Sequence, residues 1–471
     1  MKTTTINNVS IAIFLSVSKR PSIAMASPPS VAWASSHSTP TRRPERPRDE
    51  ASTPTICSPL NDPPFRYLEF YAGIGGWRMA MEEALQQAAT FTNIQSTQAV
   101  AALDHSDACL SVYSHNFPAT TNEGNYNDPK PCRIEKITTD QLVDEWQADA
   151  WFLSPPCQPH TRQHDNQSVD LQDPRSASFL HLCRLLQDAQ NIPETALPTL
   201  ICLENVVGFE TSASCRVWRK ALQRRNYAVA HFHFTPTQVG LPNDRPRYFC
   251  LAVLQKKSIE MPPQWDGIVS VETNVEVSQP PRIRTSLQVL DIPEPSAVDM
   301  TKLPKIRDFL DDDSSISHHV TVPDKLLQRS ASWCFDVVTQ DSQESACFTS
   351  GYGRFVKGTG SVLYTGPLKA AGSHPFVNFV RQRPEHRTFD GDWANALSPG
   401  SLRYFSGMEI ARLMGFAQNF SFPAASSAKQ QWKLVGNSLN VRVAARLIIL
   451  GFILSGKVST AAVSARTVRH S

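Results

Sequence analysis

The chain has 471 residues, of which 41% are hydrophobic, and its formal net charge is +3. This length can bury a large core in about two to four domains, and the composition argues against a disordered or membrane protein. Because 46 basic and 43 acidic residues nearly cancel, a nucleic-acid partner would have to bind in a local basic cleft. The ten cysteines include no CxxC pair, so we expect no metal site and no disulfide framework.

The first segment, residues 1–62, is rich in Ser, Thr, Pro and Ala and has no lasting apolar periodicity, which predicts a disordered extension. Its first acidic residue is Glu45, and the basic residues before it give a weak resemblance to a mitochondrial transit peptide. An untargeted tail or a wrongly assigned start codon explains the same composition, and we favour that interpretation.

Apolar runs alternate with helical patterns over residues 63–255. The predicted strands are Arg66–Tyr71, Gln98–Leu103, Ala150–Leu153, Thr199–Leu203, Ala228–Phe234 and Arg247–Leu254. The predicted helices include Trp77–Ala89, Asp107–Asn116 and Ser178–Gln190. This alternation predicts an α/β domain with a doubly wound, mostly parallel sheet. In such a sheet the functional residues lie in loops at the carboxyl ends of the strands.

The alternation stops at residue 256, where prolines and the acidic run Asp311–Asp313 interrupt it. We interpret residues 256–400 as a linker followed by a second, smaller domain. That domain covers about Trp333 to Ser401 and contains a glycine-rich stretch.

Residues 401–455 form the last expected segment, and residues 456–471 are expected to be a tail. The segment predicts the helices Met408–Leu413 and Asn440–Leu454. Its longest apolar stretch, Leu447–Leu454, is shorter than the about 20 residues that span a bilayer, so we expect a buried helix and no membrane partner.

A glycine-rich turn, Phe70-Tyr71-Ala72-Gly73-Ile74-Gly75-Gly76, follows the first predicted strand. Glycines let the backbone turn tightly and approach a nucleotide-like ligand closely. Asp104 ends the second predicted strand, where its carboxylate would accept hydrogen bonds from ribose hydroxyls. This constellation fits an NAD enzyme as well as a methyl-donor site, although the third glycine of GxGxxG is missing. A plain structural turn also stays open.

A cysteine motif, Leu153-Ser154-Pro155-Pro156-Cys157-Gln158-Pro159, follows a buried strand and precedes a polar loop. The two prolines before Cys157 fix the backbone and expose the thiol at the carboxyl end of the strand. A free cysteine is more often buried in a core. Here the prolines, the polar surroundings and the position in the expected crevice favour a reactive thiol.

Two further polar motifs stand beside predicted strands. Glu204 directly follows the strand Thr199–Leu203, where burial would raise its pKa and let it hold a proton. A helix-capping or surface acid is the alternative. Arg245 and Arg247 stand where the chain enters the last predicted strand and, at i and i+2 of an extended segment, point the same way. Such a pair grips a carbonyl or a phosphate, although ordinary surface arginines show the same spacing.

One chemistry uses all these groups. Cytosine C5 is too poor a nucleophile to attack a methyl sulfonium directly, but addition of a thiolate to C6 raises the electron density at C5. The addition places negative charge on the ring, so an acid must act at N3 and an arginine must hold O2. Cys157, Glu204, Arg245 and Arg247 supply that set, and the glycine loop would hold the methyl donor.

These motifs, in this order, resemble the cytosine-5 methyltransferase family. The matching blocks, spread from about Arg66 to Leu454, are the glycine loop, the Cys157 motif, Glu204-Asn205-Val206, the two arginines and Gly436-Asn437-Ser438. A finer resemblance is to the eukaryotic transfer-RNA aspartate cytosine-5 methyltransferases, the RNA-acting branch. It is carried by Cys347-Phe348-Thr349, Tyr352–Phe355, Gly358–Ser361, Leu402–Phe405 and Gly436–Val441.

The resemblance implies a Rossmann-like S-adenosylmethionine-dependent methyltransferase sheet with a small target-recognition domain. It implies S-adenosyl-L-methionine as the cofactor, bound by Ile74, Gly75, Gly76, Asp104, Ile134, Glu135, Ser154 and Ser438. The implied substrate is cytosine 38 in the anticodon loop of aspartate transfer RNA, with weak DNA binding beside it. A monomer in the cytoplasm and nucleus is expected. Candidate phosphate contacts are Arg354, Lys357, Lys369, Arg381, Arg383 and Arg387, although a solvated face explains any single one.

The sequence departs from the family pattern at two motifs and in its atypical leader of about sixty residues. His160 stands where the family usually has Phe, and Ser350-Gly351 replaces the usual Lys-Ser, which removes a phosphate contact. Two alternatives stay open: a DNA cytosine-5 methyltransferase, which uses identical chemistry, and a catalytically silent nucleic-acid-binding relative. The Cys347 block and the lack of long regulatory modules argue against the first, and the complete catalytic set argues against the second.

Overall fold

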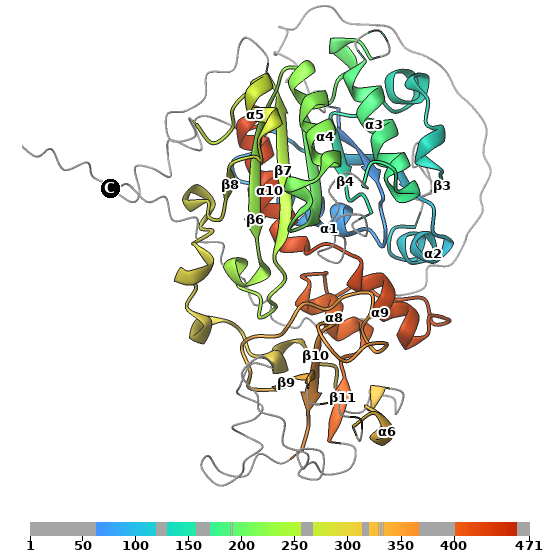
Figure 1. The fold of residues 1–471 in the computed structure, drawn as a ribbon, viewed down its shortest axis with the longest axis vertical. Coiled ribbons are helices and arrows are strands. Elements are labelled where there is room, and N and C mark those ends of the chain that lie inside the picture. The colour runs from blue at the N-terminus through green and yellow to red at the C-terminus, as the bar shows by residue number, and fades with distance from the viewer. Residues whose placement is uncertain are drawn as a thin grey trace, which may run out of the picture. The chain divides into compact units, whose positions relative to one another are not determined.

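An eight-stranded sheet forms the centre of the larger domain in the computed structural model (Figure 1). The structure describes residues 63–118, 130–156, 170–188, 190, 192–255, 267–312, 320–327, 329, 332, 334–366 and 401–458. The expected extension 1–62 and most of the expected tail lie outside these residues. So do Cys157, His160, Lys369, Arg381, Arg383 and Arg387.

The strands of the large sheet follow the order β3-β2-β1-β4-β5-β7-β6-β8. Neighbours from β3 to β5 are parallel, whereas β7 is antiparallel to both β5 and β6. The prediction of a mostly parallel sheet is therefore confirmed. The bounds are Phe65–Phe70 (β1), Thr97–Asp104 (β2), Lys130–Pro131 (β3), Ala150–Leu153 (β4), Leu200–Val206 (β5), Tyr227–Phe234 (β6), Arg247–Leu254 (β7) and Ile283–Arg284 (β8).

Each predicted strand overlaps one of these elements. The sequence pattern did not predict β3 and β8 because each has two residues, too few to show an apolar alternation. Among the helices, α1 (Gly76–Ala88), α2 (Asp107–Asn116) and α3 (Ala177–Gln187) lie within three residues of their predicted bounds.

Alternate side chains of the strands build an apolar core on each face of the sheet. Tyr67 of β1 and Cys202 of β5 belong to one core, and their neighbours Leu68 and Leu203 belong to the other. Helices α1 and α10 (Val441–Leu454) contribute to the first core, and α3 and α4 (Ala213–Arg224) contribute to the second. Strand β4 is buried throughout, as expected of a strand covered on both faces.

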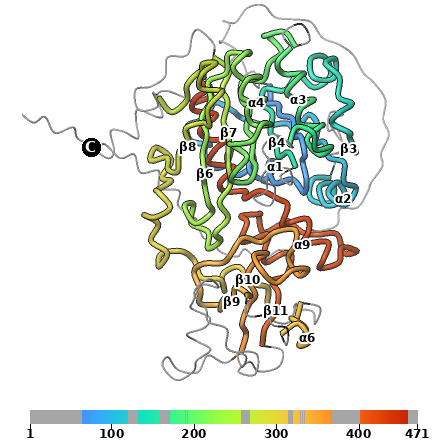
Figure 2. Tube along the Cα trace, viewed as in Figure 1, coloured from blue at the N-terminus to red at the C-terminus, as the bar shows by residue number. Residues whose placement is uncertain are grey.

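Helix α10 brings the end of the described chain back to the large sheet, where it packs against α1 and β7 (Figure 2). The segment Ala428–Leu454 has the length and composition of a membrane span, but 78% of its most apolar window is buried inside the protein. It also comprises two helices, α9 (Ala428–Gly436) and α10. The apolar character of α10 therefore fits the buried helix that the sequence predicted.

A second sheet, with the order β11-β10-β9, forms the core of the smaller domain. Strands β9 (Asp336–Thr339) and β10 (Ser361–Tyr364) are parallel, and β11 (Leu402–Tyr404) is antiparallel to β10. Because β11 follows residue 400, this sheet crosses the boundary that was expected there. The short helices α5 (Asn274–Ser278) and α6 (Asp324–Leu327) precede the sheet, and α8 (Gly407–Leu413) and α9 follow it.

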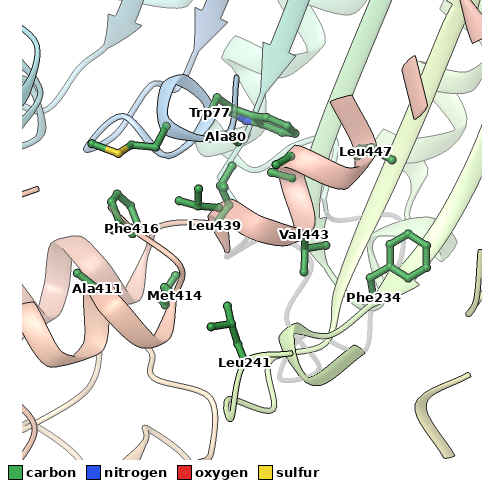
Figure 3. Close-up of a cluster of buried hydrophobic side chains, with 14 of the residues drawn as sticks. Trp77, Ala80, Phe234, Leu241, Ala411, Met414, Phe416, Leu439, Val443 and Leu447 are labelled. Carbon is green, nitrogen blue, oxygen red and sulfur yellow. The ribbon is translucent and has the colours of Figure 1, made fainter. Parts of the chain in front are cut away.

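An apolar cluster joins the smaller domain to the large sheet where α10 begins (Figure 3). Leu439 and Val443 lie between Trp77 of α1 on one side and Met414, directly after α8, on the other. Each of these four side chains is at most 4% exposed. This shared core fixes α9 and the segment after it against the carboxyl end of the large sheet.

Candidate active site

A cavity of about 770 Å³ lies at the carboxyl ends of β1, β2, β4 and β5. Its described lining comes from the ends of these strands and the segments after them, from the segment after β3, from the start of β7 and from α9. Doubly wound sheets bind their ligands at this edge, and a cavity of this size accommodates a nucleotide-sized molecule.

Asp104 accepts two backbone hydrogen bonds on the β1–β2 side of the cavity. Its Oδ2 accepts a hydrogen bond from the Gly73 amide and its Oδ1 accepts one from the Ser106 amide, both at 2.9 Å. Ile134 and Glu135, from the short helix after β3, line the same cavity. Four of the predicted cofactor residues therefore meet here: Asp104, Ile134, Glu135 and Ser154.

The other four predicted cofactor residues, Ile74, Gly75, Gly76 and Ser438, are not among the residues that line the cavity. The Ile74 side chain is buried in the core. Gly75 has a φ of +88°, and a Cβ there would lie 2.3 Å from the Phe117 ring. A Cβ on Gly76 would lie 3.0 Å from the Ser438 hydroxyl. Ile74, Gly75 and Gly76 thus shape the turn before α1. Tyr71 and Gly73 are the residues of this turn that line the cavity.

The cysteine motif and the glutamate motif meet on the β4–β5 side. Ser154, Pro155 and Pro156 line the cavity, and Asn205 Nδ2 donates a hydrogen bond of 3.2 Å to the Pro155 carbonyl. Trp77 Nε1 donates to the Ser154 hydroxyl at 2.9 Å. These bonds hold the backbone that leads directly into Cys157, the next residue after the described segment.

Glu204, the last but two residue of β5, presents its carboxylate to the cavity and is 8% exposed. Arg247 Nε lies 3.4 Å from its Oε1. Burial raises the pKa of Glu204 above its ordinary value, although Arg247 and Arg245 oppose the rise. Glu204 therefore stays protonated up to a higher pH than an exposed glutamate does.

The two arginines lie together, since Arg245 Nη1 is 3.2 Å and Arg247 Nη2 is 3.6 Å from Cys347 Sγ. Their other partners differ. Arg245 is 2% exposed and donates to the backbone carbonyls of Phe348, Gly436 and Ser438. Both arginines line the cavity. Arg247 faces Glu204, and Arg245 also joins the smaller domain to the segment before α10. The expectation that both grip the substrate stays a prediction.

Cys347 lies where these two guanidinium groups converge. Burial alone would raise the pKa of its thiol, but Arg245 and Arg247 outweigh that effect and hold the pKa below its usual value. The sequence marked Cys347 only as part of a family block and gave no signal for this contact.

Basic side chains that the sequence did not single out also line the cavity. Arg133 precedes Ile134, Lys433 comes from α9, and Arg175 is ion-paired with Asp173 at 2.6 Å. No motif marks them, because single charges in separate segments look like an ordinary solvated surface. Together they give the cavity a locally basic lining although the chain as a whole is nearly neutral.

The sheet order with its reversed β7, the ligand edge and the polar groups around the cavity define an S-adenosylmethionine-dependent methyltransferase fold. The sequence profile described as C-5 cytosine-specific DNA methylase matches residues 65–449. The chain therefore belongs to the C-5 cytosine-specific DNA methylase family, and the resemblance expected from the motifs is confirmed.

Several curated relatives share this sequence over most of its length. The Homo sapiens tRNA (cytosine(38)-C(5))-methyltransferase is 31% identical over 420 residues, which cover 82% of this chain and 98% of the relative. The Mus musculus protein of the same name is 34% identical over 418 residues, covering 82% and 92%. A Dictyostelium discoideum DNA (cytosine-5)-methyltransferase is 32% identical over 396 residues, covering 81% and 93%.

Solved structures show the same likeness in three dimensions. A Spodoptera frugiperda DNMT2 mutant matches with a TM-score of 0.60 and 28% identity, covering 82% of this chain and 99% of that one. The Schizosaccharomyces pombe Dnmt2 methyltransferase matches with a TM-score of 0.58 and 27% identity, covering 83% and 98%. The fold expected from the sequence is confirmed.

Proposed function

We propose that this chain transfers a methyl group from S-adenosyl-L-methionine to C5 of cytosine 38 in the anticodon loop of aspartate transfer RNA. The observation that carries the proposal is the arrangement around Glu204. A buried glutamate with a raised pKa lies beside Arg247, in the cavity whose wall includes the backbone leading into Cys157. Family membership supplies the reaction class.

The residues on the β1–β2 side suit the proposed cofactor. Asp104 is an acceptor for hydroxyl groups, and the apolar Ile134 and the polar Glu135 lie beyond it. We propose that these three residues and Ser154 hold the nucleoside and the methionine portion. When bound, S-adenosyl-L-methionine supplies an electrophilic methyl group on its sulfonium sulfur. The glycine turn would hold the backbone close to it.

The chain's own residues would divide the remaining chemistry. The Cys157 thiolate forms a bond to C6, and Glu204 delivers its proton to N3, so the ring stays neutral. Arg247, which lies next to Glu204, would hold O2. C5 then takes the methyl group. Loss of the C5 proton to a base breaks the C6–S bond, and the N3 proton returns to Glu204.

One observation favours RNA as the substrate directly, and two further points are compatible with it. The names of the human and mouse relatives specify a transfer RNA and its cytosine 38. The basic residues Arg133, Arg175 and Lys433 line the cavity, where they would contact phosphates around an inserted base. An enzyme acting on a base must remove it from the stack, and an unpaired loop cytosine costs less to extrude than a paired one. The Dictyostelium relative keeps DNA as the second candidate.

A methyl-transfer assay with labelled donor tests the proposal. Unmodified aspartate transfer RNA, the same RNA with cytosine 38 replaced by uracil, other transfer RNAs and duplex DNA are compared at matched concentration and salt. We expect label only in the first RNA. Equal or faster transfer to duplex DNA would support the alternative that the chain is a DNA methyltransferase. If no substrate accepted the methyl group although the donor still bound, the result would support the catalytically silent alternative.

A further inference from the structure

Phe355 is the one Phe, Tyr or Trp side chain in the described residues that is exposed, at 57% of its surface. A large apolar ring in water is unfavourable, by about 25 cal/mol for each Å² that could have been buried. The other rings of the smaller domain that the structure describes are buried, among them Phe348, Tyr352 and Tyr404. Phe355 differs from them in presenting most of its ring surface to solvent.

The loop that carries Phe355, residues 349–360, is held firmly. The Thr349 amide donates to the Thr359 carbonyl at 2.9 Å, and the Thr359 hydroxyl donates to the Phe355 carbonyl at 2.8 Å. Inside the loop, Tyr352 is buried, and its hydroxyl donates to the Ser361 carbonyl. The ring of Phe355 thus projects from a fixed backbone, and a loose loop does not explain its exposure.

The same loop rests on the wall of the active-site cavity. The Thr349–Ser350 backbone lies so close to Gly436 that a Cβ there would be 2.3 Å from Thr349. Gly353 packs in the same way against the Trp432 ring of α9. Gly436 lines the cavity, as does Lys433 on the same helix. A substrate whose target base enters this cavity therefore brings its neighbouring nucleotides toward the Phe355 loop.

Positive charge accompanies the exposed ring. The guanidinium carbon of Arg354 lies 5.1 Å from the centre of the Phe355 ring, and both Arg354 and Lys357 are exposed. An aromatic face offers stacking to any base, and adjacent cations attract the phosphates that connect bases. A protein partner would gain from the ring but has no general use for the two cations.

We propose that Phe355 stacks on an unpaired base next to the target cytosine, with Arg354 beside the adjoining phosphate. The inference rests on the proposed RNA substrate and adds the residue that positions it. Phe355 is a positioning residue, because it lies outside the cavity in which Glu204 and Arg247 meet. The ring would hold the loop of the RNA open while the target base occupies the cavity.

The test uses the full chain and a stem–loop RNA with the target cytosine in its loop. The base on either side of the target is replaced in turn by 2-aminopurine, whose fluorescence falls when it stacks. We expect wild type and Phe355→Trp to quench one of the two probes, and Phe355→Ala and Phe355→Leu to leave it bright. Affinity for the RNA should fall about 5- to 150-fold in Phe355→Ala and Phe355→Leu, the range for loss of one base–aromatic stack.

Salt dependence separates the ring from the charge. Phe355→Ala should weaken binding with an unchanged slope of log Kd against log salt, whereas Arg354→Ala should reduce that slope by about 0.7 to 0.9. Donor binding and thermal stability should stay at the wild-type level in every variant, because the ring is exposed.

The outcomes distinguish this inference from the proposed function. Wild type that neither binds nor methylates the RNA would refute the proposed function, and this inference with it. Wild type that methylates the RNA while Phe355→Ala binds it equally well would overturn the stacking inference alone. Wild-type affinity in Phe355→Leu would also overturn the stacking inference, because it would show that any apolar side chain can replace the ring.

Discussion

Two buried glutamates, Glu204 at the cavity and Glu272 in the segment after β7, have pKa values that the protein shifts in opposite directions. Arg219, which is 1% exposed, donates to Glu272 Oε1 and Oε2 at 2.9 and 2.8 Å, and His231 Nε2 lies 3.4 Å from Oε1. Burial alone would raise the pKa of Glu272, but these partners outweigh it and lower the pKa. For Glu204, burial outweighs Arg247 and Arg245, and the pKa rises.

The difference separates a structural carboxylate from one suited to proton transfer. Glu272 is held as an anion that ties the segment after β7 to α4 and β6, through Arg219 and His231. Glu204 has a weaker ionic contact in a cavity, which leaves it able to take up and release a proton. Activity should therefore depend on Glu204, and stability on Glu272.

The largest effect is expected for Glu204→Gln, because an amide cannot deliver a proton to N3. Single-turnover methylation should fall about 10²- to 10⁴-fold, with donor affinity and melting temperature nearly unchanged. Wild-type single-turnover rate should also fall as pH rises through the raised pKa of Glu204, since the protonated form is lost. Near-normal turnover combined with poor donor binding would mean that Glu204 serves the cofactor.

Glu272→Gln is the matched control, with the reverse outcome. Removing one partner of a buried ion pair leaves Arg219 uncompensated, so the free energy of unfolding should fall by about 3 to 5 kcal/mol. Methylation per folded molecule should stay near that of wild type at a temperature where the variant is folded. Denaturant unfolding and a titration of folded active sites measure the two quantities. A stable but inactive Glu272→Gln protein would remove the distinction between the two sites.

Arg245 and Arg247 offer the same comparison, of a structural role with a catalytic one, within the active site. Arg245→Lys loses donors to the carbonyls of Phe348, Gly436 and Ser438, so unfolding free energy should fall by about 1 to 3 kcal/mol. Arg247→Lys should lower the methylation rate and leave stability within about 0.5 kcal/mol of wild type. If the two variants exchanged these effects, Arg245 would be the residue that contacts the base.

A further effect is expected of pH on stability through His231. Burial would lower its pKa, but Cys250 and Glu272 raise it to about 9. A group whose pKa is raised on folding stabilises the fold fully below its unfolded value, about 6.5, and loses that contribution as pH rises through about 9. The melting temperature of wild type should therefore fall over this window. In Glu272→Gln the fall should be shallower, and an equal fall would place its origin elsewhere.

Much of this fold follows from local sequence patterns. The predicted strands that end in Leu103, Leu153 and Leu203 are strongly apolar, and each is followed by polar residues at the ligand edge. The contacts of Arg245 could not be predicted, because its acceptors are backbone carbonyls that lie 103 to 193 residues away. The pairing of β11 with β10 across residue 400 was hidden in the same way, since long-range pairing leaves no periodicity in either segment.

The central claim, covalent catalysis by Cys157, is tested most directly by trapping. Stem–loop RNA carrying 5-fluorocytosine at the target position is incubated with S-adenosyl-L-methionine and either wild type or Cys157→Ala. Fluorine at C5 cannot leave as a proton does, so the C6–S bond should persist. We predict a denaturation-resistant protein–RNA adduct, mapped by mass spectrometry to Cys157, with wild type and none with Cys157→Ala. An adduct on another residue, or turnover by Cys157→Ala above about a hundredth of the wild-type rate, would contradict the account.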